Sequence, residues 1–467
     1  MSKILNIILL LIFIHENSFQ YIVLKFRTNI DLNKLTDENY MSTTLDQKLY
    51  VNFNIGDSHQ DIPITIKSQQ LPTFVVSSSC SENISYKYNE TKSENSFHKI
   101  KDYLIQELYR YDFNEGYMVN DTLTFNSSLI FNNFTFMLAT KMSVTAKNIS
   151  GEIGLSIKKQ DTYPYLFPDR TQFLEQLKDN NLIKNRIFGI VYDTEYEGKL
   201  IFGNYIHKID NSYDENDMIT NTIDDLKDEN RDKWHIDFNC KLLKGIDKEE
   251  IYTENNTYGL IMYEIGLIVG SNTFREKFIK NYFEEKGCNE TMVTSKPFGF
   301  YQYSCDKKEQ YEDFPDIIFS VPGKYIFNFT KKELFKKIGK KYVFQIVFEI
   351  IELPINYWRL GQSFFRKYTT FINWGEKEST FSYFPPNSRS KNKDKKFSSQ
   401  VILIIILSII LIILIGVIIY FYMFCEKKRR KNRANELIDT NADGDFDYTP
   451  ADNNIQETNN DSLVNNN

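Results

Sequence analysis

The segment that is most informative about the fold is Leu360-Gly361-Gln362-Ser363-Phe364-Phe365-Arg366-Lys367-Tyr368. It lies near the end of a region, residues 46–384, in which short apolar runs alternate with polar turns. Many short runs of this kind predict an all-β architecture. The predicted strands are residues 21–27, 51–56, 125–136, 187–192, 199–202, 259–269, 316–321 and 324–329. Helical patterns are few and short, at residues 171–179, 272–285 and 331–338.

The nine-residue stretch resembles the closing signature of the pepsin-like aspartic proteases, a hydrophobic-Leu-Gly run that leads into Phe-Leu-Arg-x-Tyr. Other segments are similar to this family's motifs in the same order: residues 50–60, 151–156, 198–203 and 314–319. The resemblance implies a bilobal pepsin-like fold, with an N-terminal lobe at 46–215 and a C-terminal lobe at 216–384. Residues 20–45 are then a short propeptide-like segment or the first strand. The resemblance also pairs Cys288 with Cys305 as a disulfide of the second lobe.

The family's two catalytic aspartates have no counterpart in this sequence. Counting back from Cys80 places Lys67 at the first position, and counting back from Leu267 places Met262 at the second. In the family, two carboxyl groups a few ångströms apart share one proton, so that one activates water while the other protonates the peptide carbonyl. A charged lysine has no acceptor and a methionine does not titrate. We therefore predict that no residue here acts as a catalytic aspartate.

Three further residues are candidates for the cleft between the lobes. Tyr109 or Tyr111 falls where the family's flap tyrosine belongs, and Glu264 lies two residues after Met262. An ion pair of Lys67 with Glu264, acting as base and acid, would make an active aspartic-type endopeptidase with a non-standard dyad, which is the alternative. The simpler interpretation is drift at an unused site, with the lysine neutralised or in solvent. No metal or phosphate-loop motif is present, so no cofactor or metal is expected.

Both ends of the chain carry membrane-targeting patterns. Residues 1–19 read as a signal peptide, because Lys3 precedes an 11-residue run that is too short to span a bilayer. Residues 401–424 carry no charge, and as a helix they would be about 36 Å long, enough for a hydrocarbon core of about 30 Å. The basic cluster that follows suits a cytosolic flank. We predict a single-pass membrane protein with a lumenal or extracellular ectodomain, a basic stalk at 385–400 and a disordered cytosolic tail at 425–467.

Modification sites and charge complete the prediction. Cys80 and Cys240 lack obvious partners and are predicted to be buried thiols. A net charge of −6 gives no case for a nucleic-acid partner. Nine sequons precede the apolar run as candidate glycosylation sites: Asn83, Asn89, Asn120, Asn126, Asn133, Asn148, Asn255, Asn289 and Asn328.

These observations together predict a membrane-anchored pepsin-like protease homologue without catalytic activity. It would act as a binding or surface glycoprotein, with a peptide or protein ligand in the interlobe cleft. A structural surface glycoprotein without a specific cleft ligand is a further hypothesis.

Overall fold

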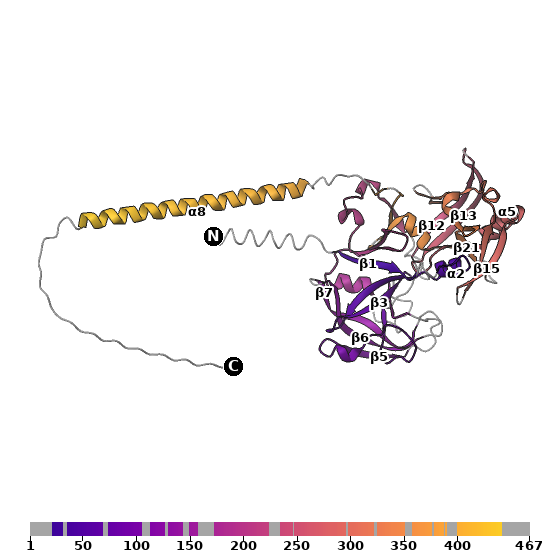
Figure 1. Cartoon of the computed structure of the whole chain (residues 1–467), viewed down its shortest axis with the longest axis horizontal. Coiled ribbons are helices and arrows are strands. Elements are labelled where there is room, and N and C mark those ends of the chain that lie inside the picture. Colours follow the sequence, from indigo (N-terminus) through magenta and orange to yellow (C-terminus); the bar gives the residue numbers. More distant parts are fainter. Residues whose placement is uncertain are drawn as a thin grey trace. The chain divides into compact units, whose positions relative to one another are not determined.

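The structure is a computed structural model, and it describes residues 21–30, 35–68, 73–104, 113–126, 129–142, 149–156, 172–223, 234–245, 247–295, 298–321, 325–350, 357–375, 378–386, 388–389 and 399–440. The chain divides into two compact units, residues 1–391 and 392–467, and each is described by itself (Figure 1). The predicted signal peptide and most of the predicted stalk lie outside the described residues.

A 13-stranded sheet forms the first part of unit one, in the order β11-β24-β23-β9-β10-β1-β2-β3-β8-β4-β7-β6-β5. Its strands are β1 (Ile22–Thr28), β2 (Leu49–Ile55), β3 (Gln60–Lys67), β4 (Phe74–Val76), β5 (His98–Leu104), β6 (Phe113–Asn126), β7 (Leu129–Met142), β8 (Gly151–Gly154), β9 (Ile187–Tyr192), β10 (Glu197–Phe202), β11 (Ile219–Ile223), β23 (Thr369–Trp374) and β24 (Ser379–Phe384). Strand β1 is an internal strand that pairs with both β10 and β2.

An 11-stranded sheet forms the second part, in the order β18-β17-β12-β13-β22-β14-β21-β16-β20-β19, with β15 paired to β16. Its strands are β12 (His235–Lys244), β13 (Glu249–Ile261), β14 (Ile268–Gly270), β15 (Asn289–Ser295), β16 (Phe298–Cys305), β17 (Asp316–Val321), β18 (Tyr325–Phe329), β19 (Phe335–Ile338), β20 (Lys341–Phe344), β21 (Ile346–Glu349) and β22 (Tyr357–Leu360). Three strands that follow residue 216, β11, β23 and β24, belong to the first sheet.

The two sheets contain the same four-stranded arrangement. In the first, β3 runs parallel to β8, β8 antiparallel to β4, and β4 parallel to β7. In the second, β13, β22, β14 and β21 repeat these three relations in the same order. The register agrees as well. Phe74 pairs with Glu152, which is two residues before Gly154, and Val269 pairs with Arg359, which is two residues before Gly361. The structure therefore contains the internal duplication that the sequence alone did not reveal.

Helices are short in unit one, as predicted. They are α2 (Tyr40–Leu45), α3 (Phe173–Asp179), α4 (Asn272–Phe274), α5 (Lys280–Glu285), α6 (Lys331–Leu334) and α7 (Gln362–Lys367), with a π-helical stretch at Arg275–Ile279 between α4 and α5 and single 3-10 turns at Glu90–Lys92, Ile206–Lys208, Glu215–Asp217 and Lys308–Gln310. One hydrophobic core extends over both sheets and is rich in aromatic rings. Trp234 packs edge-on against Phe188, and Tyr263 against Phe365. A mostly β fold with few short helices is thus confirmed.

Three predicted elements were wrong in their bounds. Residues 125–136 are not one strand, because the β6–β7 hairpin turns between Asn126 and Leu129. The helix predicted at 331–338 ends at Leu334, since Phe335 begins a strand that pairs with β20. The strand predicted at 259–269 is broken after Ile261 by the loop that carries Met262. In the first two cases a tight hairpin, and in the third the parallel pairing of β13 with the distant β22, overrides the local pattern.

The second unit is described only through helix α8 (Ser399–Thr440). The predicted membrane span, residues 401–424, lies within α8, although the side chains of 401–406 and 409–410 are outside the described set. In the described part of the chain, no helix was found that is long and apolar enough to cross a bilayer. Residues 425–440, predicted to be a disordered tail, continue the helix, because they are rich in good helix formers and include the Glu426–Arg430 pair one turn apart.

Candidate functional site

Lys67 is the last residue of β3, and the register of the sheet determines its neighbour. Parallel pairing with β8 sets Thr65 opposite Glu152 and Lys67 opposite Gly154. The Lys67 Nζ lies 2.8 Å from Oε1 of Glu152. The Glu152 side chain is completely buried, whereas that of Lys67 is 21% exposed. Lys67 thus pairs with a buried carboxylate while part of its own side chain remains exposed to solvent.

The Glu152 carboxylate needs this partner. Moving an unpaired carboxylate into a protein interior costs several kcal/mol. The Thr65 hydroxyl, which lies near Glu152, donates a hydrogen bond of 3.0 Å to the carbonyl of Gly151. Burial and the charge of Glu152 raise the pKa of Tyr50. The sequence interpretation overlooked Glu152, although a charged residue inside the apolar run 151–155 was a usable signal.

Met262 occupies the equivalent position after β13. Strand β13 runs parallel to β22, with Ile261 opposite Leu360, and the Met262 amide donates a 3.0 Å hydrogen bond to the Leu360 carbonyl. Gly361 follows, and a Cβ there would lie 2.0 Å from the carbonyl oxygen of Leu267, so only glycine permits this close approach. The thioether of Met262 is half-buried and cannot titrate.

The Ser68 hydroxyl group connects the loop after β3 to the loop after β13 by hydrogen bonds, and we call this contact the junction. Ser68 Oγ lies 2.6 Å from the Ile261 carbonyl, to which it donates, and it accepts from the Tyr263 amide at 3.3 Å. The Ser68 hydroxyl is next to Lys67 in sequence, and its two partners flank Met262. Ser68, which follows Lys67, therefore contacts the residues on either side of Met262.

Glu264 completes this junction. Its Oε2 lies 3.0 Å from Ser68 Oγ and accepts from the Ser68 amide at 3.3 Å. Burial raises the pKa of Glu264, and this effect outweighs the Lys67 charge and the Ser68 hydrogen bonds, which lower it. The single hydroxyl proton of Ser68 thus has two acceptors within reach, the Ile261 carbonyl at 2.6 Å and Glu264 Oε2 at 3.0 Å. The alternative hypothesis paired Lys67 with Glu264, whereas the structure places the Lys67 ammonium 2.8 Å from the Glu152 carboxylate.

The chemistry of the junction is one ammonium, one buried carboxylate and one carboxyl of raised pKa. The Lys67 ammonium neutralises the buried Glu152 carboxylate. The Glu264 carboxyl group lies beside the Ser68 hydroxyl and not beside another carboxyl group with which it could share a proton. Tyr109 and Tyr111 lie outside the described residues. Among the residues that the structure describes, no group of three His, Cys, Asp or Glu side chains is arranged to hold a metal ion.

The cysteines are arranged as predicted. Cys288 and Cys305 form a disulfide that ties the segment after α5 to the end of β16. Cys80 and Cys240 are buried thiols, and burial raises the pKa of both. Cys425 is exposed on α8.

The asparagines of the predicted sequons differ in solvent exposure. Four are exposed: Asn83, Asn133, Asn255 and Asn289. Three are half-buried, and of these Asn328 has a buried side-chain oxygen without a hydrogen-bond partner among the described residues. The half-buried sites are Asn89, Asn120 and Asn328. The side chain of Asn126 and all of Asn148 lie outside the described set.

Comparison with known proteins agrees with the fold. A family model described as eukaryotic aspartyl protease matches residues 48–383. No curated protein matches the chain. Because the matched segment covers more than half of the 467 residues and coincides with the predicted region of resemblance, the chain belongs to the eukaryotic aspartyl protease family.

Proposed function

We propose that this chain is a member of the family without peptidase activity, which binds a peptide or protein ligand where its relatives cleave one. The observation that carries the proposal is the Lys67–Glu152 ion pair at the end of β3. The duplicated strand arrangement supports placing Lys67 and Met262 at the two dyad positions. Lys67 stands opposite Gly154 in one repeat, and Met262 stands beside Gly361 in the other, as the two members of a symmetric dyad would.

The chemistry of these two side chains argues against acid catalysis. A dyad that shares a proton needs two carboxyl groups in contact. An ammonium donates hydrogen bonds and accepts none, and the charge of Lys67 is already balanced by Glu152 at 2.8 Å. Removing a complete catalytic unit in other hydrolases lowers kcat by about 10⁴- to 10⁶-fold.

One observation favours the alternative, an active endopeptidase with a non-standard dyad. Burial gives Glu264 a raised pKa, as expected of a general acid, and it lies at the junction of the two loops. Glu152 would then have to act as the base while it is paired with Lys67. We regard this as the second candidate because that ion pair favours an unreactive carboxylate.

A cleavage assay separates the two candidates. The purified protein is incubated with a pool of quenched fluorescent decapeptides from pH 3 to pH 7, with and without pepstatin. The proposal expects no turnover above the background of a mock purification. Turnover that pepstatin blocks and that Glu264→Gln abolishes would establish the alternative.

Ligand binding is measured with the same peptides carrying a single dye. Met262→Trp places a large ring at the junction, and we expect it to abolish a saturable change in anisotropy. Thr222→Trp, on the exposed face of β11, is the matched control and should leave binding intact. Equal binding by both variants would contradict a ligand at this junction and would favour a purely structural surface role.

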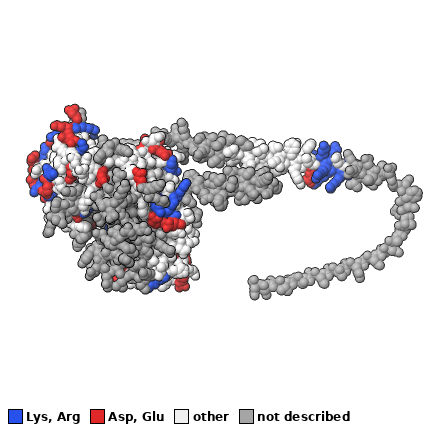
Figure 2. All heavy atoms as spheres, turned by 180° about the vertical axis from the view of Figure 1, so that it is seen from behind, with Lys and Arg blue, Asp and Glu red and all other residues white. Residues whose placement is uncertain are grey.

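We further propose that α8 anchors the protein in a membrane and that exposed sequons carry glycans. All the large apolar side chains described from Leu407 to Phe424 are exposed. Figure 2 shows Lys and Arg gathered at one end of the described part of α8, beside a segment without charged side chains. Alkaline carbonate extraction tests the anchor, since an anchored chain stays with the membrane pellet. A glycosidase-sensitive mass lost on Asn83→Gln and Asn255→Gln would support glycosylation.

A further inference from the structure

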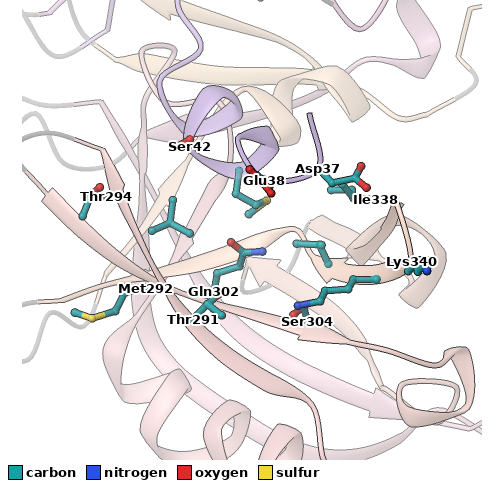
Figure 3. Close-up of a pocket in the computed structure, with 14 residues that line it drawn as sticks. Asp37, Glu38, Ser42, Thr291, Met292, Thr294, Gln302, Ser304, Ile338 and Lys340 are labelled. Carbon is teal, nitrogen blue, oxygen red and sulfur yellow. The ribbon is translucent and has the colours of Figure 1, made fainter. Parts of the chain in front are cut away.

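A pocket of about 670 Å³ lies between helix α2 and the β15–β16 hairpin (Figure 3). It shares no lining residue with the junction of Lys67, Met262 and Glu264. Its volume falls within the range of pockets that hold ligands in proteins. On one side the Asp37 carboxylate lies against Gly339, so the segment before α2 contacts the β19–β20 turn there.

The floor of the pocket carries two polar side chains that are nine-tenths buried. Gln302 is 7% exposed and Ser304 is 3% exposed. Neither side chain has a hydrogen bond to any residue that the structure describes. Figure 3 shows the Gln302 amide turned into the hollow and Ser304 on the same floor. Because buried polar groups are normally hydrogen-bonded, these two side chains indicate a polar ligand in the pocket.

The face of the sheet that forms this floor also carries Asn289, the asparagine of a predicted sequon. Residues directly opposite each other in an antiparallel pair project from the same face, with Cβ atoms about 5 Å apart. Asn289 is opposite Ser304, and Thr291, which lines the pocket, is opposite Gln302. Asn289 is exposed, and its side chain has no hydrogen bond to a described residue. The Asn289 amide therefore lies beside the pocket floor and is free to carry a modification.

Helix α2 covers only part of this face. Val293 is opposite Phe300, and both pack in a hydrophobic cluster with Met41 of α2. The next two rows of the face, toward Asn289, are polar and border the pocket instead. A ligand attached to Asn289 would complete the cover of these polar rows.

The chemistry of the lining suits a carbohydrate. Hydroxyl groups that can both donate and accept hydrogen bonds line the pocket, those of Ser42, Thr291, Thr294 and Ser304. The Gln302 amide also donates and accepts, and apolar carbon of Met41 and Val343 lies among these groups. An N-acetylated sugar has the matching combination, because hydroxyl and amide groups surround an apolar ring face and a methyl group.

The charges around the pocket favour a neutral ligand. The charged side chains of the described lining are two acidic and two basic ones, Asp37, Glu38, Lys340 and Lys341. All four are exposed. Because their charges cancel and water screens them, neither an anion nor a cation is preferred.

We propose that Asn289 carries an N-linked glycan and that this pocket holds the inner sugars of that glycan. Attachment joins Asn289 Nδ2 to the anomeric carbon of an N-acetylated sugar supplied on a lipid diphosphate; the amide loses a proton and the lipid diphosphate leaves. Gln302 and Ser304 hydrogen-bond the hydroxyl and acetamide groups of the sugars. Because the sugars are tethered beside the pocket, their effective concentration is on the order of millimolar, and weak contacts suffice. This inference rests on the glycosylation proposed above and is independent of peptidase activity.

The test uses the full-length protein, purified in detergent micelles from a eukaryotic secretory host. Glycopeptide mass spectrometry identifies the asparagines that carry glycans, and peptide N-glycosidase then acts on the native protein while release is followed at each site. Asn255 is the internal control, since it is exposed in the same sheet, at a bulge of β13, and lies outside the pocket lining. We expect release at Asn289 to be at least about tenfold slower than at Asn255, because two hydrogen bonds must break before the enzyme gains access. After denaturation the two rates should be similar.

Variants of the floor locate the sugars. Gln302→Ala with Ser304→Ala should bring the release rate at Asn289 to within about threefold of that at Asn255, through the loss of two hydrogen bonds. Neither side chain has a hydrogen-bond partner among the described residues, so the double variant leaves no polar group unpaired, and an unchanged urea midpoint of the deglycosylated protein confirms the fold. Ser320→Ala on β17, which removes a hydroxyl outside the pocket, is the control and should leave the release rate at Asn289 unchanged.

The outcomes separate this inference from the proposed glycosylation. Glycans at Asn83 and Asn255 but none at Asn289 would overturn the inference alone, whereas no glycan at any of these three sites would overturn both. Equal release rates at Asn289 and Asn255 in the native protein would place the sugars in solvent. A slow rate at Asn289 that the double variant does not change would show that something other than the pocket floor protects the glycan.

Discussion

Replacing Lys67 by methionine should destabilise the protein by removing the counter-charge of a buried carboxylate. Glu152 is completely buried and its Oε1 is 2.8 Å from the Lys67 ammonium. At an effective dielectric constant of about 20, two unit charges at that separation attract by about 6 kcal/mol. Because desolvation offsets part of this, breaking a buried pair costs about 3–5 kcal/mol in practice. We expect Lys67→Met to lower the free energy of unfolding by that amount at pH 7.

The double variant distinguishes the charge from the side chain. Lys67→Met with Glu152→Met removes both charges and keeps similar volume, and such replacements are often neutral or stabilising. Glu152→Met alone should cost less, about 1–2 kcal/mol, because the 21% exposed lysine can turn its ammonium toward water. The cycle should therefore give a coupling free energy above about 2 kcal/mol.

Urea unfolding followed by tryptophan fluorescence measures these free energies, because Trp234 and Trp358 are both buried in the core. Lys241→Met is the matched control, since Lys241 pairs with Glu250 at 2.7 Å while both side chains are about one-third or more exposed. An exposed pair contributes under about 1 kcal/mol. If Lys67→Met costs no more than Lys241→Met, or if the double variant is as unstable as Lys67→Met, the ion pair does not have the role assigned to it.

Three further predictions concern pH and the disulfide. Burial raises the pKa of Glu264, so its protonated form stabilises the fold below the unfolded value of about 4.3, and that stability is lost as the pH rises through the folded value. Glu264→Gln should therefore lose less stability than the wild type between pH 4 and pH 7 in urea titrations. Burial, helped by Lys208, lowers the pKa of His207, so its stabilising neutral form is lost as the pH falls below the unfolded value of about 6.5. His207→Gln should flatten the stability profile between pH 7 and pH 5, and an unchanged slope would contradict this assignment. Replacing Cys288 and Cys305 by serine opens an 18-residue loop and should cost about 3 kcal/mol of unfolding free energy, seen as a lower urea midpoint.

Local patterns in the sequence were sufficient for several elements. The predicted strands at 187–192 and 316–321 coincide with β9 and β17, and the disulfide joins the predicted cysteines. The two strands are apolar runs bounded by turns, and the cysteine pair was predicted from the family resemblance. Helix α2 gave no such signal, because its six residues include Ser42, Thr43 and Thr44, which favour turns and strands over helices.

The partners of the candidate site could not be read from local patterns. Lys67 and Glu152 are 85 residues apart in the chain, and only the parallel register of β3 with β8 brings them together. A weaker clue was present in the sequence, because Glu152 is a charged residue inside the otherwise apolar run 151–155. The pocket beside β15 was beyond sequence analysis for the same reason, since it depends on helix α2 packing against a hairpin of the second sheet.

Each of the two repeats contains an ion pair with a buried carboxylate. Two residues before Gly154 and Gly361, this chain has the charged residues Glu152 in β8 and Arg359 in β22. Glu152 pairs with Lys67, and Arg359 pairs with Glu349 of β21, whose side chain is 5% exposed. Either charge of such a pair would be costly if buried alone, so the two members are stable only in combination. Of the two forms of the drift interpretation, a neutralised lysine or a lysine in solvent, the ion pair with the completely buried Glu152 fits the first. We infer that the fold retains Lys67 as the counter-ion of Glu152, and that Lys67→Asp without a change at Glu152 would leave the buried carboxylate without its counter-ion and weaken the fold rather than create an enzyme.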